Sequence, residues 1–191
     1  MSIPHPQVAI VLAAGASTRF ADGFKQLAVL GDQALVERAA QAALAAGCFE
    51  AVLVVSGAVS LSGVVPAGAT IVDNPRWASG QASSLQAGIE AARALGAEAV
   101  VVGLADQPMV TAEDWLLVSA AETELPIVVA TYQGIRGNPV RLAASIWDDL
   151  PEDGDEGARV LLRKRPDLVA AVACLGDASD VDTVEDLKQW N

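Results

Sequence analysis

Residues 8–25 read VAIVLAAGASTRFADGFK, and this stretch decides the fold that we expect for the chain. Residues 8–13 form a short apolar run, which is typical of a strand buried inside a sheet. Gly15 ends the run, and small residues at such a point let the backbone approach a ligand and direct its N–H groups at an anion. The stretch therefore predicts a buried strand that leads into an anion-binding loop.

Two cations in this loop, Arg19 and Lys25, favour the binding of β- and γ-phosphates, and the Ser17 and Thr18 hydroxyls add hydrogen-bond donors. The loop is not a Walker A motif, because no Gly-Lys-Ser/Thr follows, and it lacks the dinucleotide fingerprint, because only Gly15 fits that pattern. The alternative is an ordinary strand–helix turn with surface cations. With both cations present, phosphate binding is the favoured interpretation.

Outward from this stretch, short apolar runs alternate with segments of helical periodicity. This alternation at βαβ spacing predicts an α/β fold over residues 1–191, a single three-layer domain with a mostly parallel central sheet. Further strands are expected at 51–55, 71–72, 99–104, 127–130 and 168–173, and a turn or hairpin at 132–140. Helices are expected at 34–46 (capped by Asp32), 82–94, from Thr111, at 142–150, 156–164 and 183–189.

The composition excludes several classes of partner. The formal net charge of −12 opposes binding to nucleic acid or to an anionic membrane, although a few cations in one cleft can still attract a small anion. Cys48 and Cys174 lie far apart with no second type of ligand, so no zinc or iron–sulfur site is expected. No apolar run reaches the roughly 18 residues of a membrane span. The N-terminal residues do not read as a signal peptide, so we expect a soluble, cytoplasmic protein.

Acidic side chains occur where ligands bind in such sheets, beyond the carboxyl ends of the strands. Asp106 directly follows the apolar run 99–104 and could hold Mg²⁺, or it could merely cap the next turn. Asp180 and Asp182 share one face of an extended segment, and one of them could supply a second metal ligand. The alternative is that Asp182 or Thr183 caps the last helix.

Two further polar segments could contribute to a site. Ser83 and Ser84 begin the helix expected at 82–94, where backbone N–H groups can hold a substrate, or they could serve only as helix caps. Gly134 and Gly137 flank Arg136, which suggests a loop that bends close to another group. A plain hairpin explains the two glycines nearly as well. The acidic run 152–156 is interpreted as a solvated surface.

Six motifs occur in one order over almost the whole chain: LAAGASTRF…K, NPRWASGQASSL, LADQP, GIRGNP, GDEGAR and DVDTVEDL. Together they resemble those of the molybdenum cofactor cytidylyltransferases, within the wider family of α/β nucleotidyltransferases. The resemblance implies the Mg²⁺-dependent transfer of CMP from CTP to molybdopterin, with release of pyrophosphate. It also implies a molybdoenzyme as a possible client.

The resemblance also assigns roles to residues, with Lys25, Arg19 and Asp106 as the catalytic set. Ser83 and Ser84 match the segment that lines the nucleotide and substrate site. Asp106 matches the metal-binding acid of the family, and Asp182 matches a late acid that could complete the metal site. Residues 137–139 match a loop on the pterin side. The nucleotide loop corresponds to Leu12, Ala13, Ala14, Gly15, Ser17, Arg19 and Lys25.

The chain departs from the family pattern at two positions and in one spacing. Ala21 stands where a glycine is common, and the spacing from Arg19 to Lys25 is one residue longer than usual. Val184 replaces a frequent proline in the first turn of the last helix, where either residue is tolerated.

Three rival functions remain open at this point. The first is another transferase of this fold, one that uses GTP or a sugar or polyol phosphate. The Ala13-Ala14-Gly15 sequence resembles cytidylyl enzymes, whereas guanylyl relatives usually read Ala-Gly-Gly. The second is a non-catalytic cofactor-binding chaperone, which Asp106 together with Lys25 argues against. The third, a nicotinamide-dependent oxidoreductase, lacks its glycine fingerprint.

Overall fold

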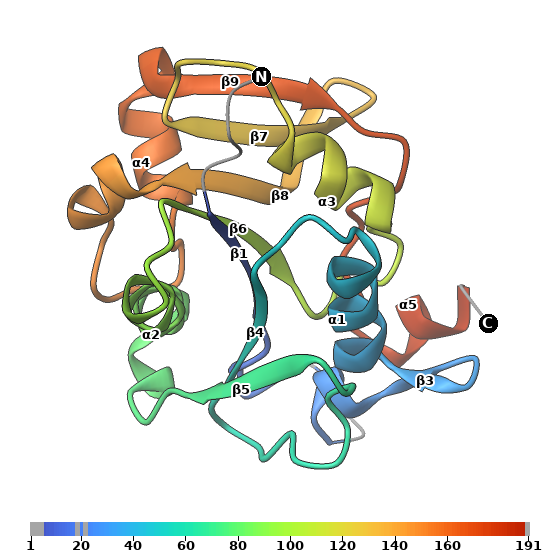
Figure 1. The fold of residues 1–191 in the computed structure, drawn as a ribbon. Coiled ribbons are helices and arrows are strands. Elements are labelled where there is room, and N and C mark those ends of the chain that lie inside the picture. The colour runs from blue at the N-terminus through green and yellow to red at the C-terminus, as the bar shows by residue number, and fades with distance from the viewer. Residues whose placement is uncertain (1–5, 18–19, 21–22, 190–191) are drawn as a thin grey trace.

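In the computed structural model, which describes residues 6–17, 20 and 23–189, a seven-stranded sheet with the order β5-β4-β1-β6-β8-β7-β9 divides the molecule (Figure 1). Neighbouring strands run parallel, except that β8 is antiparallel to both β6 and β7. The mostly parallel sheet expected from the sequence is thereby confirmed. The strands are β1 (Gln7–Leu12), β4 (Ala51–Ser56), β5 (Ala69–Asp73), β6 (Ala99–Leu104), β7 (Ile127–Tyr132), β8 (Ile135–Ala143) and β9 (Val169–Ala173).

Helices cover both faces of this sheet and give the expected three layers (Figure 1). One face carries α1 (Leu35–Ala45) and α3 (Ala112–Ser119). The other carries α2 (Gln81–Ala94), the 3₁₀ segment Ala144–Asp149 and α4 (Arg159–Lys164). A small hairpin of β2 (Val29–Leu30) and β3 (Gln33–Ala34) and the last helix, α5 (Val184–Gln189), lie beside α1. Among the described residues, no helix is both long and apolar enough to cross a membrane.

The apolar run of β1 alternates between the two cores. Val8, Ile10 and Leu12 pack into the cluster under α2, whereas Ala9 and Val11 pack into the cluster under α1. Successive side chains of a strand point to opposite faces, so a central strand covered on both sides must be apolar throughout. This requirement explains the uninterrupted apolar stretch at the start of the sequence.

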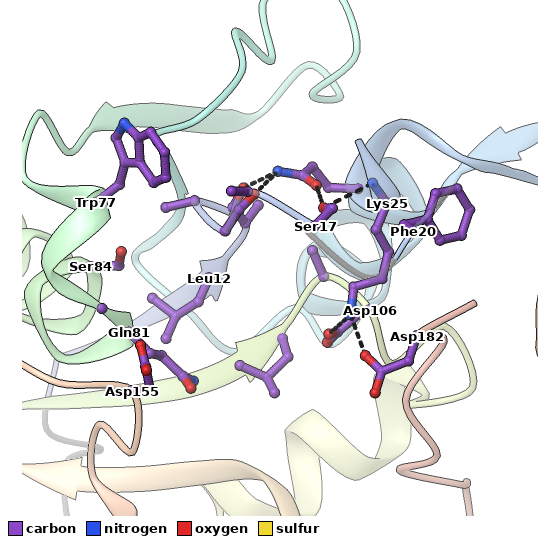
Figure 2. Close-up of a pocket in the computed structure, with 18 of the residues that line it drawn as sticks. Leu12, Ser17, Phe20, Lys25, Trp77, Gln81, Ser84, Asp106, Asp155 and Asp182 are labelled. Atoms are coloured by element: carbon purple, nitrogen blue, oxygen red, sulfur yellow. Dashed lines mark hydrogen bonds and ion pairs between the residues drawn. The ribbon is translucent and has the colours of Figure 1, made fainter. Parts of the chain in front are cut away.

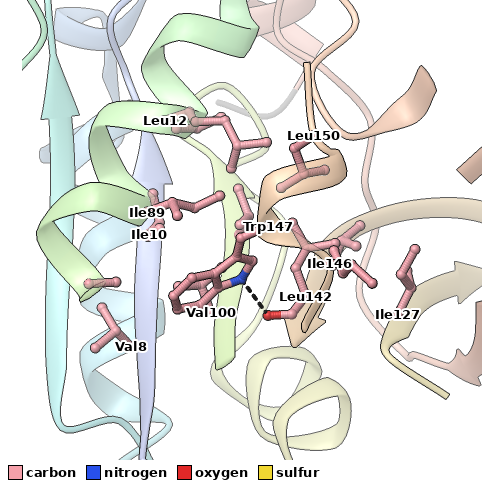
Figure 3. Packing of buried hydrophobic residues seen from close by; sticks show 14 of the residues in the cluster. Val8, Ile10, Leu12, Ile89, Val100, Ile127, Leu142, Ile146, Trp147 and Leu150 are labelled. Atoms are coloured by element: carbon pink, nitrogen blue, oxygen red, sulfur yellow. Dashed lines mark hydrogen bonds between the residues drawn. The ribbon is translucent and has the colours of Figure 1, made fainter. Parts of the chain in front are cut away.

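The core on the α2 face is closed by Trp147, which is 2% exposed. Its indole N–H donates to the Leu142 carbonyl at 3.1 Å, so the buried polar atom keeps a partner (Figure 3). The sequence analysis placed both residues in a helix at 142–150, and this prediction was wrong. Leu142 pairs with Val100 and Ile127 as part of β8, and only 144–149 turns, as a 3₁₀ segment.

The start of α1 also differs from the prediction. Asp32 was expected to cap this helix, but the N-cap residue is Ala34, and no side chain caps it. Asp32 instead lies in the tight turn that joins β2 to β3. The hairpin was not foreseen, because two-residue strands leave no periodicity in a sequence. The hairpin alternative for 132–140 is confirmed by the pairing of β7 with β8.

Candidate active site

A cavity of about 620 Å³ opens at the carboxyl ends of β1 and β6. Its wall combines the loop after β1, the start of α2, the segment after β6 and two residues from the last third of the chain (Figure 2). Most of the predicted site residues that the structure describes lie here. The lining residues are Leu12, Ala13, Ala14, Gly15, Ala16, Ser17, Phe20, Lys25, Gln26, Trp77, Ala78, Gly80, Gln81, Ser84, Leu104, Ala105, Asp106, Asp155 and Asp182.

The loop after β1 is held in shape by Gln26, which the sequence analysis missed. The Gln26 side-chain amide is buried and donates to the carbonyls of Ala13 and Gly15, each at 2.9 Å. Its oxygen accepts from the Ser17 hydroxyl at 2.7 Å, and that hydroxyl also accepts from the backbone N–H of Lys25 at 2.9 Å. Ser17 was expected to donate to a ligand, but here its hydroxyl is used inside the loop.

Ser17 adopts a φ of 55°, a conformation that is uncommon for a residue with a side chain. The bonds to Gln26 and Lys25 hold the residue in this conformation. Arg19, assigned to the phosphates, and its neighbour Thr18 lie outside the described residues, as does Ala21.

Lys25 crosses the mouth of the cavity and joins two acids that are distant in the sequence (Figure 2). Its ammonium donates to Asp106 Oδ2 at 2.6 Å and to Asp182 Oδ1 at 2.8 Å. Burial by itself lowers the pKa of Lys25, but the Asp106 and Asp182 carboxylates outweigh that effect and raise the pKa above its ordinary value. Lys25 is therefore charged throughout the physiological pH range.

The structure shows which of the two candidate residues caps the last helix. Thr183 caps α5, since its hydroxyl accepts from the backbone N–H of Asp186 at 3.1 Å. The Asp186 carboxylate accepts in return from the backbone N–H groups of Thr183 and Asp182, at 2.8 and 3.0 Å. This reciprocal arrangement is a capping box. The capping box uses the backbone of Asp182 but not its carboxylate, which accepts from Lys25 instead.

A third acid, Asp180, lies behind this pair. Its carboxylate accepts from the Gln107 amide at 2.8 Å, and the Gln107 oxygen accepts from the Asn138 amide at 3.1 Å. Burial and the nearby Asp106 carboxylate raise the pKa of Asp180. This chain of side chains connects the segment 137–139, expected on the acceptor side, to Asp180, which stands two residues before Asp182.

The two serines at the start of α2 have different positions. Ser84 lines the cavity, whereas Ser83 is completely buried and donates to the carbonyls of Arg76 and Gly80. The Asn74 amide donates to both hydroxyls, at 2.9 and 3.0 Å. Ser83 therefore supports the wall of the cavity from behind.

Two side chains in the wall had no role in the sequence analysis. Trp77 stands at the end of the cavity away from Lys25, and Asp155 stands beside the start of α2 (Figure 2). Asp155 belongs to the acidic run 152–156, interpreted above as solvated surface. This run folds onto α2, where the Gly154 carbonyl accepts from the backbone N–H of Ala82 at 2.9 Å. This contact and the bond from the Gly154 N–H to the Ser79 carbonyl, also 2.9 Å long, distinguish it from an ordinary charged loop.

A loop at the carboxyl edge of a mostly parallel sheet, facing two acids bridged by a lysine, lies where such folds bind their ligands. Residues 9–169 match the family described as the MobA-like NTP transferase domain. The chain therefore belongs to this family.

Comparison with individual proteins agrees with this assignment. The chain is 37% identical to nicotine blue oxidoreductase of Paenarthrobacter nicotinovorans, over 93% of both chains. The structure of a Mycobacterium tuberculosis Rv0371c homologue from Mycobacterium sp. strain JC1 is similar, with a TM-score of 0.79 and 29% identity over 96% of this chain and 93% of that one.

Two more distant structures share the fold. A nucleotidyl transferase from Methanothermobacter thermautotrophicus has a TM-score of 0.78 at 20% identity and covers 96% of this chain and 95% of its own. A manganese complex of Rv0371c from M. tuberculosis H37Rv has a TM-score of 0.73 at 24% identity, with 97% of each chain covered.

Proposed function

We propose that this protein transfers CMP from CTP to molybdopterin and releases pyrophosphate. The observation that carries the proposal is the contact of Lys25 with both Asp106 and Asp182 at the mouth of the cavity. Within an NTP transferase family, such a cluster can both hold a cation and bind phosphates. The choice of CTP rests on Ala13-Ala14-Gly15, and the choice of molybdopterin rests on the resemblance of the six motifs.

The residues at the cavity mouth fit a divalent metal ion, which nucleotidyltransferases generally use. Asp106 and Asp182 already share one cation, the Lys25 ammonium, and carboxylate oxygens are the ligands that Mg²⁺ prefers. When bound there, Mg²⁺ would neutralise phosphate charge and orient the triphosphate. We assign its binding to these two carboxylates.

The protein's own groups have simple tasks in this reaction. A phosphate oxygen of the acceptor attacks the α-phosphorus of CTP, and the bond to the β-phosphate bridging oxygen breaks. A phosphate monoester is largely ionised at pH 7, because its second pKa is near 6, so no general base is required. The loop 12–17 positions the triphosphate, and Lys25, together with Arg19, holds the pyrophosphate as it leaves. Catalysis then depends on alignment and charge neutralisation.

The decisive assay measures pyrophosphate release from CTP, GTP and ATP with Mg²⁺, with and without molybdopterin. We expect release from CTP only in the presence of the acceptor. Asp106→Asn should bind CTP weakly with Mg²⁺ and turn over at least about 100-fold more slowly. Near-normal turnover by this variant would contradict the role of Asp106, and a preference for GTP would reject cytidylyl transfer.

A second candidate function follows from the relative named nicotine blue oxidoreductase, which is 37% identical over nearly the whole chain. An oxidoreductase would release no pyrophosphate from any nucleoside triphosphate. Absence of release with every nucleotide, together with redox turnover of a dye substrate, would favour this second function over the first.

A further inference from the structure

The ammonium of Lys25 occupies the place between the two acids where a metal ion would bind. It lies 2.6 Å from Asp106 and 2.8 Å from Asp182, and the three side chains are 15%, 24% and 30% exposed. Because both carboxylate oxygens contact the same nitrogen, a cation held by both side chains would lie close to the position that the ammonium now occupies. The lysine and a metal ion therefore compete for the same pair of oxygens.

We propose that Lys25 is a resident counter-ion, and that a divalent cation binds only when this ammonium moves from the two carboxylates to the phosphates of the nucleotide. The inference rests on the proposed function in one respect, that Asp106 and Asp182 hold the metal. It adds a coupling between metal and nucleotide that neither carboxylate could provide alone.

The local structure allows this exchange. The backbone N–H of Lys25 is fixed by the Ser17 hydroxyl, and the following residue, Gln26, is buried. The four-carbon side chain of a lysine can rotate about such a fixed backbone. Lys25 and the loop residues 12–17 line the same cavity, so its ammonium can reach phosphates there without rearrangement of the fold.

The charges define the direction of the effect. With Lys25 in place, one of the two negative charges on the acid pair is neutralised, which weakens the attraction for a second cation. When phosphates draw the ammonium away, its neutralising charge leaves the acid pair, and the attraction of Asp106 and Asp182 for a divalent cation increases. Metal and nucleotide should therefore raise each other's affinity by the same factor, as thermodynamic linkage requires.

The test measures Mn²⁺ binding to the protein without nucleotide, by electron paramagnetic resonance. We expect Lys25→Met and Lys25→Gln to bind Mn²⁺ at least about tenfold more tightly than the wild type, because one competing charge near 3 Å is removed. Lys25→Arg should resemble the wild type. Lys164→Met removes the same charge from an exposed position at the end of α4, so it controls for net charge and should leave Mn²⁺ affinity unchanged.

Two further measurements use the same variants. Mn²⁺ should raise the melting temperature of Lys25→Met more than that of the wild type, since a ligand that binds the folded state more tightly stabilises it more. The wild type should bind CTP more tightly with Mn²⁺ than without it, and Lys25→Met should lose most of this enhancement.

The proposal is overturned if the neutral Lys25 variants bind Mn²⁺ no more tightly than the wild type, or if Lys164→Met gains as much as they do. Mn²⁺ binding without nucleotide does not depend on turnover. A protein that releases no pyrophosphate, but whose Lys25 variants gain Mn²⁺ affinity, would refute the proposed function and leave this inference standing.

Discussion

Asp114 shows how one buried carboxylate can join two distant segments. It is completely buried and accepts from the backbone N–H and the hydroxyl of Thr111, at 2.8 and 2.9 Å. It also accepts from the backbone N–H groups of Leu175 and Gly176, at 3.0 and 3.2 Å. A β-carbon on Gly176 would lie 2.2 Å from this carboxylate, so only glycine allows the approach. Four donors compensate for burial of the charge.

Replacing this carboxylate should be costly. Asp114→Ala leaves several buried donors without a partner, and we expect it to lower the free energy of unfolding by about 3 kcal/mol. Glu113→Ala removes an exposed acid from the same first turn of α3 and should change stability by less than about 0.5 kcal/mol. Urea denaturation measures both effects, and equal losses in the two variants would refute the role given to Asp114.

The two cysteines differ in reactivity for a related reason. Burial and the neighbouring Asp114 carboxylate raise the pKa of the Cys174 thiol to about 11, whereas Cys48 is half-buried. At pH 8 only about one Cys174 thiol in a thousand would be ionised. We expect a thiol reagent at pH 8 to label Cys48 alone in the folded protein and both cysteines after denaturation. Rapid labelling of Cys174 in the folded protein would contradict this environment.

At the scale of elements, the loop after β1 is fixed along the end of β4. The Ala13 N–H donates to the Val55 carbonyl, and the Ala58 N–H donates to the Ala14 carbonyl, at 3.0 and 3.1 Å. Gly57 lies between them, and a β-carbon there would be 2.5 Å from Trp77 Cβ and 2.8 Å from Ala14 Cβ. The loop after β1 and the 3₁₀ turn Trp77–Ser79 therefore both pack against the backbone of Gly57, which has no side chain to separate them.

Two alanine substitutions should separate folding from binding at this loop. Gly57→Ala should lower stability by about 1–3 kcal/mol, because it forces Trp77 and Ala14 apart. At Gly15 an added β-carbon would meet no atom of the described residues within 4 Å, apart from its chain neighbours, so Gly15→Ala should retain its stability. Gly15 lines the cavity, however, and its new methyl group should weaken CTP binding. Urea denaturation and calorimetric CTP titration check the pair; unchanged affinity for Gly15→Ala would argue against a nucleotide at this loop.

The same elements show what the sequence can and cannot predict. The apolar runs of β1 and β6 predict two strands of the sheet. The position of Asp106 directly after the second run predicts that it lies at the carboxyl edge of that sheet. The role of Gln26 could not be predicted from the sequence, because a glutamine that contacts carbonyls 11 and 13 residues earlier produces no periodic pattern. Its contact becomes visible only once the loop has its shape.

The boundaries of elements were less predictable where tertiary contacts decide them. Leu142 is a strand residue because β6 and β7 flank it, although its local sequence suits a helix. Thr183 and Asp182 were equal candidates for the helix cap, and the contact of Asp182 with Lys25, 157 residues earlier, distinguishes them. Propensity gives way to packing in both cases.

At the scale of the whole molecule, the last segment of the sequence returns to the first loop. Val181 is completely buried with Phe20, Leu30 and Leu35, and its backbone N–H donates to the Asp106 carbonyl at 2.8 Å. This packing places Asp182 at the cavity mouth. The acid pair therefore depends on an apolar contact between the two ends of the described chain.

Weakening this contact should affect stability and binding together. Val181→Ala removes buried methyl groups, and we expect a loss of about 2 kcal/mol in the free energy of unfolding. Mn²⁺-dependent CTP binding should weaken as well, because Asp182 is less firmly placed. Leu175→Ala is the control, since Leu175 precedes the same segment but is 80% exposed. Thermal denaturation and calorimetry measure both properties, and a stability loss with unaltered CTP binding would separate Val181 from the site.

The distance in sequence between Lys25 and Asp182 also has a consequence for the newly made chain. The two residues are 157 positions apart, so at roughly 5–20 residues per second a ribosome needs roughly 8–30 s to travel from one codon to the other. During that interval Lys25 has at most one of its two acidic partners. The acid pair therefore cannot assemble until translation has passed residue 182, and the metal site that we propose there can form only after that point.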